Sequence, residues 1–210
     1  HYELPPPFFE LVLGEHLKYS SALFERGDSL DDAEQRMLDL YLERARLQDG
    51  QDILELGCGW GSLTLHMARH LPNARILAVS NSRPQREFIL GRAEALGLSN
   101  IEIVTADMNH FSTDRRFDRV VSIEMFEHMK NYERLLAKVA EHLREDGLLF
   151  IHVFAHQKYA YHYVAEGPDD WMARYFFTGG TMPSTDLFTH FADHMEQIDH
   201  WVVSGTHYED

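Results

Sequence analysis

Apolar residues along this 210-residue chain switch repeatedly between helical spacing and short continuous runs. Ser29 can cap a helix that ends near Leu47. The apolar positions at helical spacing within it are Leu30, Ala33, Met37, Leu38 and Tyr41. Further along, short apolar runs predict strands at 52–56, 75–79, 101–105, 118–123 and 148–154, with helices at 62–70, 84–96 and 132–143 between them. This alternation predicts an α/β fold, in which helices cover both faces of a mostly parallel sheet.

The pattern divides the chain into three parts. Residues 1–155 hold an extended lead-in with one short helix, followed by the α/β core. Residues 156–197 are rich in aromatic side chains and histidines and have weaker periodicity, so we expect a cap or substrate-side insertion there. Residues 198–210 are expected to return to the sheet through a strand at 198–203. His1 is not a start residue, and we expect a chain that is trimmed at its ends.

Composition narrows the range of partners. The chain is 44% hydrophobic, enough for a real core, and its formal charge is -15, from 34 acidic and 19 basic residues. Such a charge disfavours nucleic-acid binding and strong attachment to an anionic membrane, and it suits a cationic small molecule. The single cysteine, Cys58, fits a reducing compartment, so we expect a cytoplasmic protein. No apolar run reaches the ~18 residues of a membrane span, and no signal peptide is visible.

A glycine-rich turn follows the first predicted strand. In the run ILELGCGWG at 53–61, Gly57, Gly59 and Gly61 are spaced two apart, and Glu55 precedes them. Glycines at these positions allow a sharp turn and a close approach of the backbone to a ligand. The spacing is neither that of a dinucleotide fold nor that of a P-loop. A tight turn without a ligand is one reading; the other is that the run resembles motif I of class I S-adenosylmethionine (SAM) methyltransferases, with S-adenosylhomocysteine (SAH) as product.

Polar residues after the next two strands suit the other parts of SAM. Asn81 and Gln85 carry amides that can donate to and accept from the ribose hydroxyls, where most class I methyltransferases place an acid. Asp107 can accept from the adenine amino group while Met108 packs on the ring. The competing reading makes Asn81 a helix cap or turn residue and Asp107 a helix N-cap or turn residue.

Several longer strings resemble the cyclopropane-fatty-acid-synthase-like methyltransferases. They are the segments at 1–4, 18–20, 55–64, 80–85 and 126–132. Within that superfamily, DWMARYFFTGGTMPS at 170–184 and the segment at 199–208 resemble the coclaurine N-methyltransferase group of alkaloid biosynthesis. The resemblance implies a SAM-dependent fold with a helical cap, contacts from Tyr19 and Ser20 to SAM, and further helices after the point where this chain stops. It leaves a homodimer open.

The same resemblance bears on the methyl acceptor. Cyclopropane synthases hold a bicarbonate base with a cysteine, a glutamate, a histidine and a tyrosine. Here Ser21 stands at the cysteine position, while Glu127 and His152 match the acid and the imidazole. Loss of the cysteine puts the bicarbonate site in doubt and favours methylation of an amine.

Glu124, Glu127 and His128 leave the fourth predicted strand together. If this segment is helical or turn-like, the three side chains lie at i, i+3 and i+4 and can face one pocket. An amine must be neutral to attack the methyl group, and a carboxylate or imidazole can take its proton. We therefore expect these three to be the catalytic residues. The competing reading is that the two acids are solvated residues at a helix start, with His128 a capping or core residue.

The substrate side is expected to involve His152, Tyr161, Trp171 and Phe177. Aromatic rings can stack on a flat substrate and attract a cationic amine, although packing within a cap explains them equally well. His152 also fits a core position, because Phe150 and Phe154 flank it on one face of its strand. Fourteen histidines invite a metal hypothesis, but none falls in a recognised ligand spacing, so we expect no metal.

Three functions compete. The leading one is SAM-dependent N-methylation of a small amine on an aromatic, benzylisoquinoline-like framework. The second is methyl or methylene transfer to unsaturated lipid acyl chains, which Ser21 disfavours. The third is a SAM-binding module without catalysis, which the acidic and histidine set at 124–128 disfavours.

Overall fold

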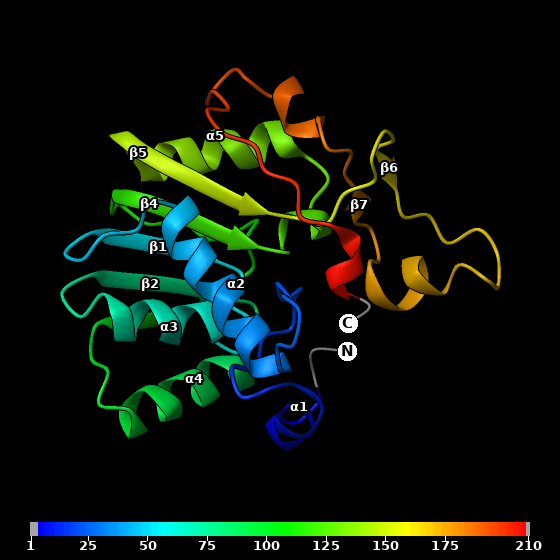
Figure 1. The fold of residues 1–210 in the computed structure, drawn as a ribbon. Helices are drawn as coiled ribbons and strands as arrows, with labels where there is room; N and C mark the ends of the chain where they lie inside the picture. Colours follow the sequence, from blue (N-terminus) through cyan, green and yellow to red (C-terminus); the bar gives the residue numbers. More distant parts are fainter. Residues whose placement is uncertain (1–3, 209–210) are drawn as a thin grey trace.

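The computed structural model describes residues 4–208, so the first three residues of the segment at 1–4 lie outside the described part. A five-stranded parallel sheet with the order β3-β2-β1-β4-β5 forms the centre (Figure 1). Its strands are β1 (Asp52–Leu56), β2 (Arg75–Ser80), β3 (Ile101–Thr105), β4 (Phe117–Ile123) and β5 (Leu143–His152). The predicted strands are confirmed, with β5 beginning five residues earlier than expected.

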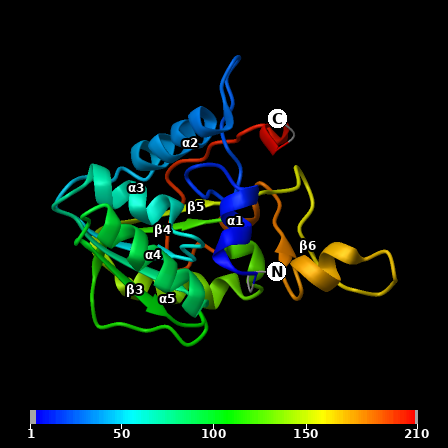
Figure 2. The same ribbon diagram turned by 90° about the horizontal axis from the view of Figure 1, so that it is seen from below.

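Helices cover both faces of this sheet (Figures 1 and 2). On one face α2 (Leu30–Arg44) and α3 (Ser62–His70) pack on Ile53, Ile76 and Val121, and α4 (Arg83–Ala95) packs on Ala78. On the other face α5 (Tyr132–His142) packs on the side chains that alternate with these, among them Leu54. β1 is buried on both faces, and three of its five residues, Ile53, Leu54 and Leu56, are apolar.

Ser29 starts α2 as predicted. Its hydroxyl accepts a hydrogen bond from the backbone N–H of Asp32, and the Asp32 carboxylate accepts from the backbone N–H of Ser29. This reciprocal capping box satisfies two donors that a helix start would otherwise leave without partners. The lead-in before it contains the short helix α1 (Pro6–Val12), whose Phe9 ring packs on Trp60.

The segment after β5 contains short elements only. These are β6 (Tyr161–His162) and β7 (Thr181–Met182), paired antiparallel, the π-helical turn η2 (Met172–Phe176) and the 3-10 turn η3 (Leu187–His190). The insertion is anchored to η1 (Phe126–His128) and the residue after it: a Cβ on Gly180 would overlap the carbonyl oxygen of Glu127, and the Thr181 hydroxyl donates to the carbonyl of Met129 at 3.1 Å.

The strand expected at 198–203 is wrong. Within the described residues this segment joins no sheet, and a 3-10 turn η4 (Gly205–Tyr208) follows it. Its side chains are held by α2 and the residues just after it: Asp199 pairs with Arg46 at 2.6 Å, and Trp201 lies 5.1 Å from the Arg44 guanidinium. These contacts place the segment against α2 and the residues that follow it.

Candidate functional site

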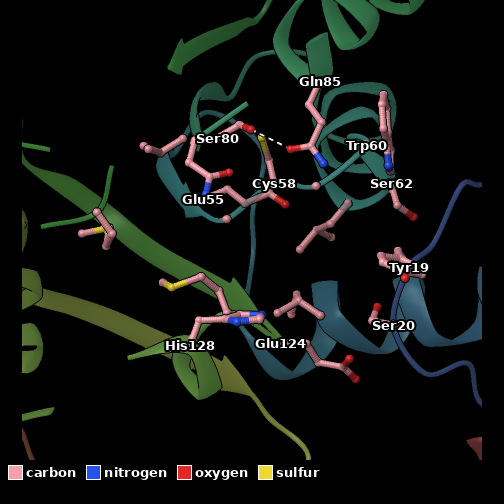
Figure 3. A pocket seen from close by; sticks show the side chains of 18 of the residues that line it. Tyr19, Ser20, Glu55, Cys58, Trp60, Ser62, Ser80, Gln85, Glu124 and His128 are labelled. Carbon is pink, nitrogen blue, oxygen red and sulfur yellow. Dashed lines mark hydrogen bonds between the residues drawn. The ribbon is translucent and has the colours of Figure 1, made fainter. Parts of the chain in front are cut away.

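A cavity of about 340 Å³ lies at the carboxyl ends of the parallel strands (Figure 3). Ligands in open α/β sheets bind at this edge, and the volume is in the range of small-molecule sites. The lead-in and α2 close its other side. The predicted site residues that line it are Tyr19, Ser20, Gly57, Gly59, Asn81, Gln85, Asp107, Met108, Glu124 and His128.

The glycine turn forms one wall. Gly57, Gly59 and Gly61 all have positive φ, at 84°, 52° and 86°. A Cβ on Gly57 would lie 2.8 Å from the Met125 side chain, and one on Gly61 would lie 2.7 Å from Ile89, so these two glycines permit close packing. A Cβ on Gly59 would meet nothing within 4 Å. Gly59 therefore faces open space on the cavity side, where a ligand can approach the backbone.

Two polar groups in the same wall lack partners. Trp60 Nε1 and Ser62 Oγ are buried and have no hydrogen-bond partner among the described residues, although both residues line the cavity. Burying such groups is costly unless a ligand or water satisfies them. Below them, Glu55 is fully buried and accepts a 2.5 Å hydrogen bond from the Thr64 hydroxyl, and burial raises its pKa to about 7. The cavity thus offers hydrogen-bonding groups to a polar ligand.

The ends of β2 and β3 contribute the next group. The Ser80 hydroxyl donates to Gln85 Oε1 at 2.7 Å, so the amide nitrogen is what Gln85 can offer to a ligand. Ser82, not Asn81, caps α4, which removes the competing reading of Asn81 as the cap. Asp107 accepts from the backbone N–H of Asn109 at 2.7 Å and forms a turn while it also lines the cavity.

Glu124 and His128 reach the cavity from the end of β4, but Glu127 does not. Glu124 has a left-handed backbone, φ 48°, and only Phe126–His128 forms a helical turn. The helical i, i+3 and i+4 geometry therefore does not apply, and the expectation that all three face one pocket is wrong. Glu124 Oε1 accepts from the backbone N–H of Ser21 at 3.3 Å, which ties the lead-in to this edge of the sheet.

Glu127 is fully buried behind the wall. Its Oε1 accepts from the backbone N–H of Phe154 at 3.0 Å, while Oε2 has no hydrogen-bond partner within residues 4–208. Burial, reinforced by the nearby charge of Glu124, raises the pKa of Glu127 to about 8. The His128 pKa is lowered by burial, so its imidazole is neutral at pH 7.

His152 belongs to a buried chain of hydrogen bonds instead of the cavity wall. Lys18 Nζ donates to the Tyr41 hydroxyl at 3.1 Å, and that hydroxyl lies 2.6 Å from His152 Nδ1. Because an ammonium can only donate, the Tyr41 proton points to Nδ1, which acts as the acceptor. Burial lowers the pKa of Lys18 to about 8 and that of His152 to about 3. Lys18 also donates to Ser20 Oγ at 2.5 Å.

The predicted aromatic residues divide into two groups. Phe177 is buried, and its ring centre lies 5.3 Å from that of His128 and 5.0 Å from that of Tyr163. Trp171 and Tyr161 are exposed and do not line the cavity. Phe177 does not line the cavity either, but it packs behind His128, whereas the other two lie on the surface of the insertion.

Sequence reasoning missed several wall residues, chiefly Lys18, Tyr41, Trp60 and Ser62. Lys18 belongs to the segment at 18–20 that resembles the methyltransferase family, and its place next to Tyr19 was the available signal for a role in the site. Tyr41 and Trp60 are indistinguishable from core residues in a single sequence, because only the fold turns their polar atoms toward the cavity or its neighbours.

Comparisons with known proteins agree with this geometry. The profile of the family described as Mycolic acid cyclopropane synthetase matches residues 1–210. An (S)-coclaurine N-methyltransferase of Thalictrum flavum subsp. glaucum is 43% identical over 210 residues, covering 99% of this chain and 58% of that relative. A cyclopropane-fatty-acyl-phospholipid synthase of Escherichia coli (strain K12) is 29% identical, covering 100% of this chain and 52% of that relative.

Among solved structures, a coclaurine N-methyltransferase bound to N-methylheliamine and SAH has a TM-score of 0.92 and 44% identity. The match covers 98% of this chain and 62% of that chain. The chain thus spans about three fifths of the length of these N-methyltransferase relatives. This similarity confirms the expected class I SAM-methyltransferase fold.

No helix in residues 4–208 combines the length and the apolar character that crossing a membrane requires.

Proposed function

The chain belongs to the mycolic acid cyclopropane synthetase family, and within it we propose that the protein transfers a methyl group from SAM to the nitrogen of a small aromatic amine. One observation carries the proposal: a single cavity brings the Gly57–Gly61 turn together with Glu124 and His128. The glycine turn suits SAM, and Glu124 and His128 suit an amine. The 43% identity to an N-methyltransferase, against 29% to a cyclopropane synthase, supports an amine over a lipid.

The residues present fit SAM. Gly59 leaves room for the methionine part, and Trp60 Nε1 and Ser62 Oγ are buried polar atoms without protein partners. Gln85 and Asp107 line the side on which a ribose and an adenine would lie, and Tyr19 and Ser20 close the cavity from the lead-in. When bound, SAM supplies a methyl group already activated by its sulfonium, so the protein's task is to position and prepare the nucleophile.

His128 is suited to take the proton of an amine. Its imidazole lines the cavity and is neutral at pH 7, because burial lowers its pKa. A neutral imidazole can accept a proton, and the carboxylate of Glu124 on the same wall can stabilise the cationic nitrogen that develops. The Phe177 ring, 5.3 Å from His128 between ring centres, would hold the imidazole in place from behind the cavity wall.

Glu127 would act from behind this wall. With a pKa of about 8 it carries a proton at neutral pH, which sits on Oε2 because Oε1 accepts from Phe154. We therefore assign the neutral Glu127 to fixing, through its bond to Phe154, the turn that carries His128, a positioning role and not a direct contact with the amine.

The proposed function also covers the substrate, the cellular location and the oligomeric state, which the similarity to known proteins does not establish. A small-molecule amine is the expected substrate, in keeping with the formal charge of -15. A cytoplasmic location and a homodimer stay predictions.

Initial-rate measurements test this function. The protein is incubated with SAM and either a panel of benzylisoquinoline-like amines or vesicles of unsaturated phospholipid, and SAH release is followed in both arms. We expect release with amines only, at the same rate in bicarbonate-free buffer. Release that requires vesicles and bicarbonate would replace the proposal with the lipid reaction, and release in neither arm would favour a binding module.

A further inference from the structure

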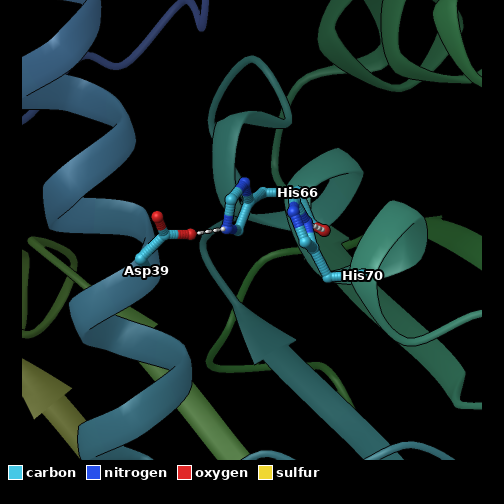
Figure 4. A group of neighbouring side chains, drawn as sticks. All are labelled: Asp39, His66 and His70. Atoms are coloured by element: carbon cyan, nitrogen blue, oxygen red, sulfur yellow. Dashed lines mark hydrogen bonds and ion pairs between the residues drawn. The ribbon is translucent and has the colours of Figure 1, made fainter.

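A second group of chemically active side chains lies between α2 and α3, outside the cavity described above. Asp39 comes from α2, and His66 and His70 come from successive turns of α3 (Figure 4). One ligand atom from each residue lies within 4.8 Å of the other two. None of the three lines the cavity, so this group has no part in the proposed methyl transfer.

His66 is the buried member of the group. Its side chain is 5% exposed, and Nε2 lies 3.0 Å from Asp39 Oδ1. The contact is that of an ion pair, and Nε2 has no partner in strict hydrogen-bond geometry among the described residues. A buried nitrogen and a carboxylate oxygen at this separation are close enough to bind one shared cation.

The two other side chains are oriented by further hydrogen bonds. His70 Nδ1 lies 2.9 Å from the carbonyl oxygen of His66, so Nδ1 carries the proton and Nε2 keeps its lone pair. Gln35 Nε2 donates to Asp39 Oδ1 at 3.0 Å from the preceding turn of α2. Metal-binding histidines and carboxylates are held by outer hydrogen bonds of this kind.

Charge favours a cation here. The surface of α2 beside Asp39 is strongly acidic, and Arg36 is the basic residue in it. The acids around this depression are Glu25, Asp28, Asp32 and Glu43.

We propose that Asp39, His66 and His70 form a binding site for one divalent transition-metal ion, such as Zn²⁺, that joins α2 to α3. Two imidazoles and one carboxylate suit Zn²⁺ and its neighbours, whereas Mg²⁺ and Ca²⁺ prefer oxygen ligands only. Spacing along the sequence could not reveal the site, because the third ligand comes from a different helix.

The site would stabilise the wall of the cavity. Leu38, next to Asp39, and Leu63, one turn before His66, both line that cavity. An ion that binds only the folded protein raises its stability by mass action. At a free concentration about 100-fold above its dissociation constant, Zn²⁺ should raise Tm by roughly 5–10 °C.

Calorimetric titration of tag-free, chelator-treated protein tests the proposal. Zn²⁺ should bind at one equivalent and Mg²⁺ should not bind. His70→Gln and Asp39→Asn change exposed side chains, so the fold should persist, and each should weaken Zn²⁺ binding by at least about tenfold. His190→Gln is the matched control, because His190 is an exposed histidine with Asp186 at 3.9 Å, and it should bind as the parent does.

Circular dichroism establishes that each variant is folded, and thermal melts with and without Zn²⁺ give an independent readout. The site is supported if the Tm increase disappears in His70→Gln and Asp39→Asn but persists in His190→Gln. It is overturned if the parent shows no saturable Zn²⁺ binding, or if His70→Gln and the parent give the same isotherm and the same increase in Tm.

Discussion

Glu127 and His128 are adjacent in the chain and face opposite sides of the same wall: His128 lines the cavity, while Glu127 is fully buried and bonds the backbone N–H of Phe154. This division separates two effects that mutagenesis can measure. A residue in the wall can alter cofactor binding directly. A residue behind the wall can alter turnover only through the group in front of it.

We expect Glu127→Gln to reduce kcat by up to about 10²-fold, the lower limit of a general-base contribution, because Glu127 acts only through His128. The affinity for SAH should stay unchanged, because Glu127 does not line the cavity. Steady-state rates and calorimetric titration with SAH measure the two quantities. Glu141→Gln, an exposed acid on α5, is the control. A collapse of SAH affinity with normal turnover per bound cofactor would contradict this role.

Glu127 also affects stability in a pH-dependent way. Its folded-state pKa of about 8 lies above the ordinary value of 4.5, so its contribution is fully present below pH 4.5 and is lost as pH rises toward 8. Glu127→Gln removes this loss, and its Tm should fall less than that of the parent between about pH 5 and pH 8. Glu55 and Glu34 each have a pKa of about 7, so the Tm of the Glu127→Gln variant should still fall in part as pH rises. Parallel Tm profiles for the two proteins would refute the assignment.

Gly59→Val should abolish SAH binding. The added side chain enters open space on the cavity side, at a residue with φ 52°. Backbone strain of about 1–2 kcal/mol accompanies the change, so stability must be measured too. Gly97→Val is the matched control, because Gly97 has φ 67° and also meets nothing within 4 Å, but lies outside the cavity. If both variants bind SAH as the parent does, the glycine turn does not hold the cofactor.

Tyr41→Phe should lower stability by about 1–3 kcal/mol, since the variant leaves buried polar groups without their shared partner. The hydroxyl that is lost accepts from Lys18 and lies 2.6 Å from His152 Nδ1. For a domain of this size the cost corresponds to a decrease in Tm of roughly 2–12 °C. Urea unfolding measures the change. Tyr159→Phe, at a side chain that is 66% exposed, should be neutral. Equal stability of both variants would show that the hydrogen-bond chain contributes nothing.

Phe177→Leu should raise the KM for the amine while the KM for SAM stays the same. The Phe177 ring does not line the cavity but lies against His128 and Tyr163, so its loss would act on the amine through His128. Trp171→Leu changes an exposed ring of the same insertion and should leave both constants unchanged. Initial rates at varied amine and varied SAM separate the two. An increased KM for SAM alone would place Phe177 on the cofactor side.

The sequence predicted the core of the fold well, for a physical reason. The strand at 52–56 is buried on both faces, so its apolar run had clear ends. Ser29 marked the start of α2, where it forms a capping box. The segment at 198–203 has a similar apolar content, but Asp199 and Trp201 bind Arg46 and Arg44 instead of a sheet. Such long-range contacts leave no local pattern.

The candidate site was predicted in part. Residues at strand ends were placed correctly because parallel strands end at one edge of the sheet, as Asn81 and Asp107 show. The placement of Glu127 failed because it assumed a helix, whereas Glu124 takes a left-handed conformation that breaks the periodicity. Lys18 was not assigned a role, since its burial depends on Tyr41, which lies on another element.

The position of the transferred methyl group tests the central claim most directly. The protein is incubated with SAM carrying a trideuterated methyl group, an equimolar mixture of benzylisoquinoline-like amines, and vesicles of unsaturated phospholipid, and all products are fragmented in a mass spectrometer. The account predicts the label on the nitrogen of an amine, with unlabelled lipids, and no labelled product from Gly59→Val. Label in the acyl chains of the phospholipid, with unlabelled amines, would contradict it.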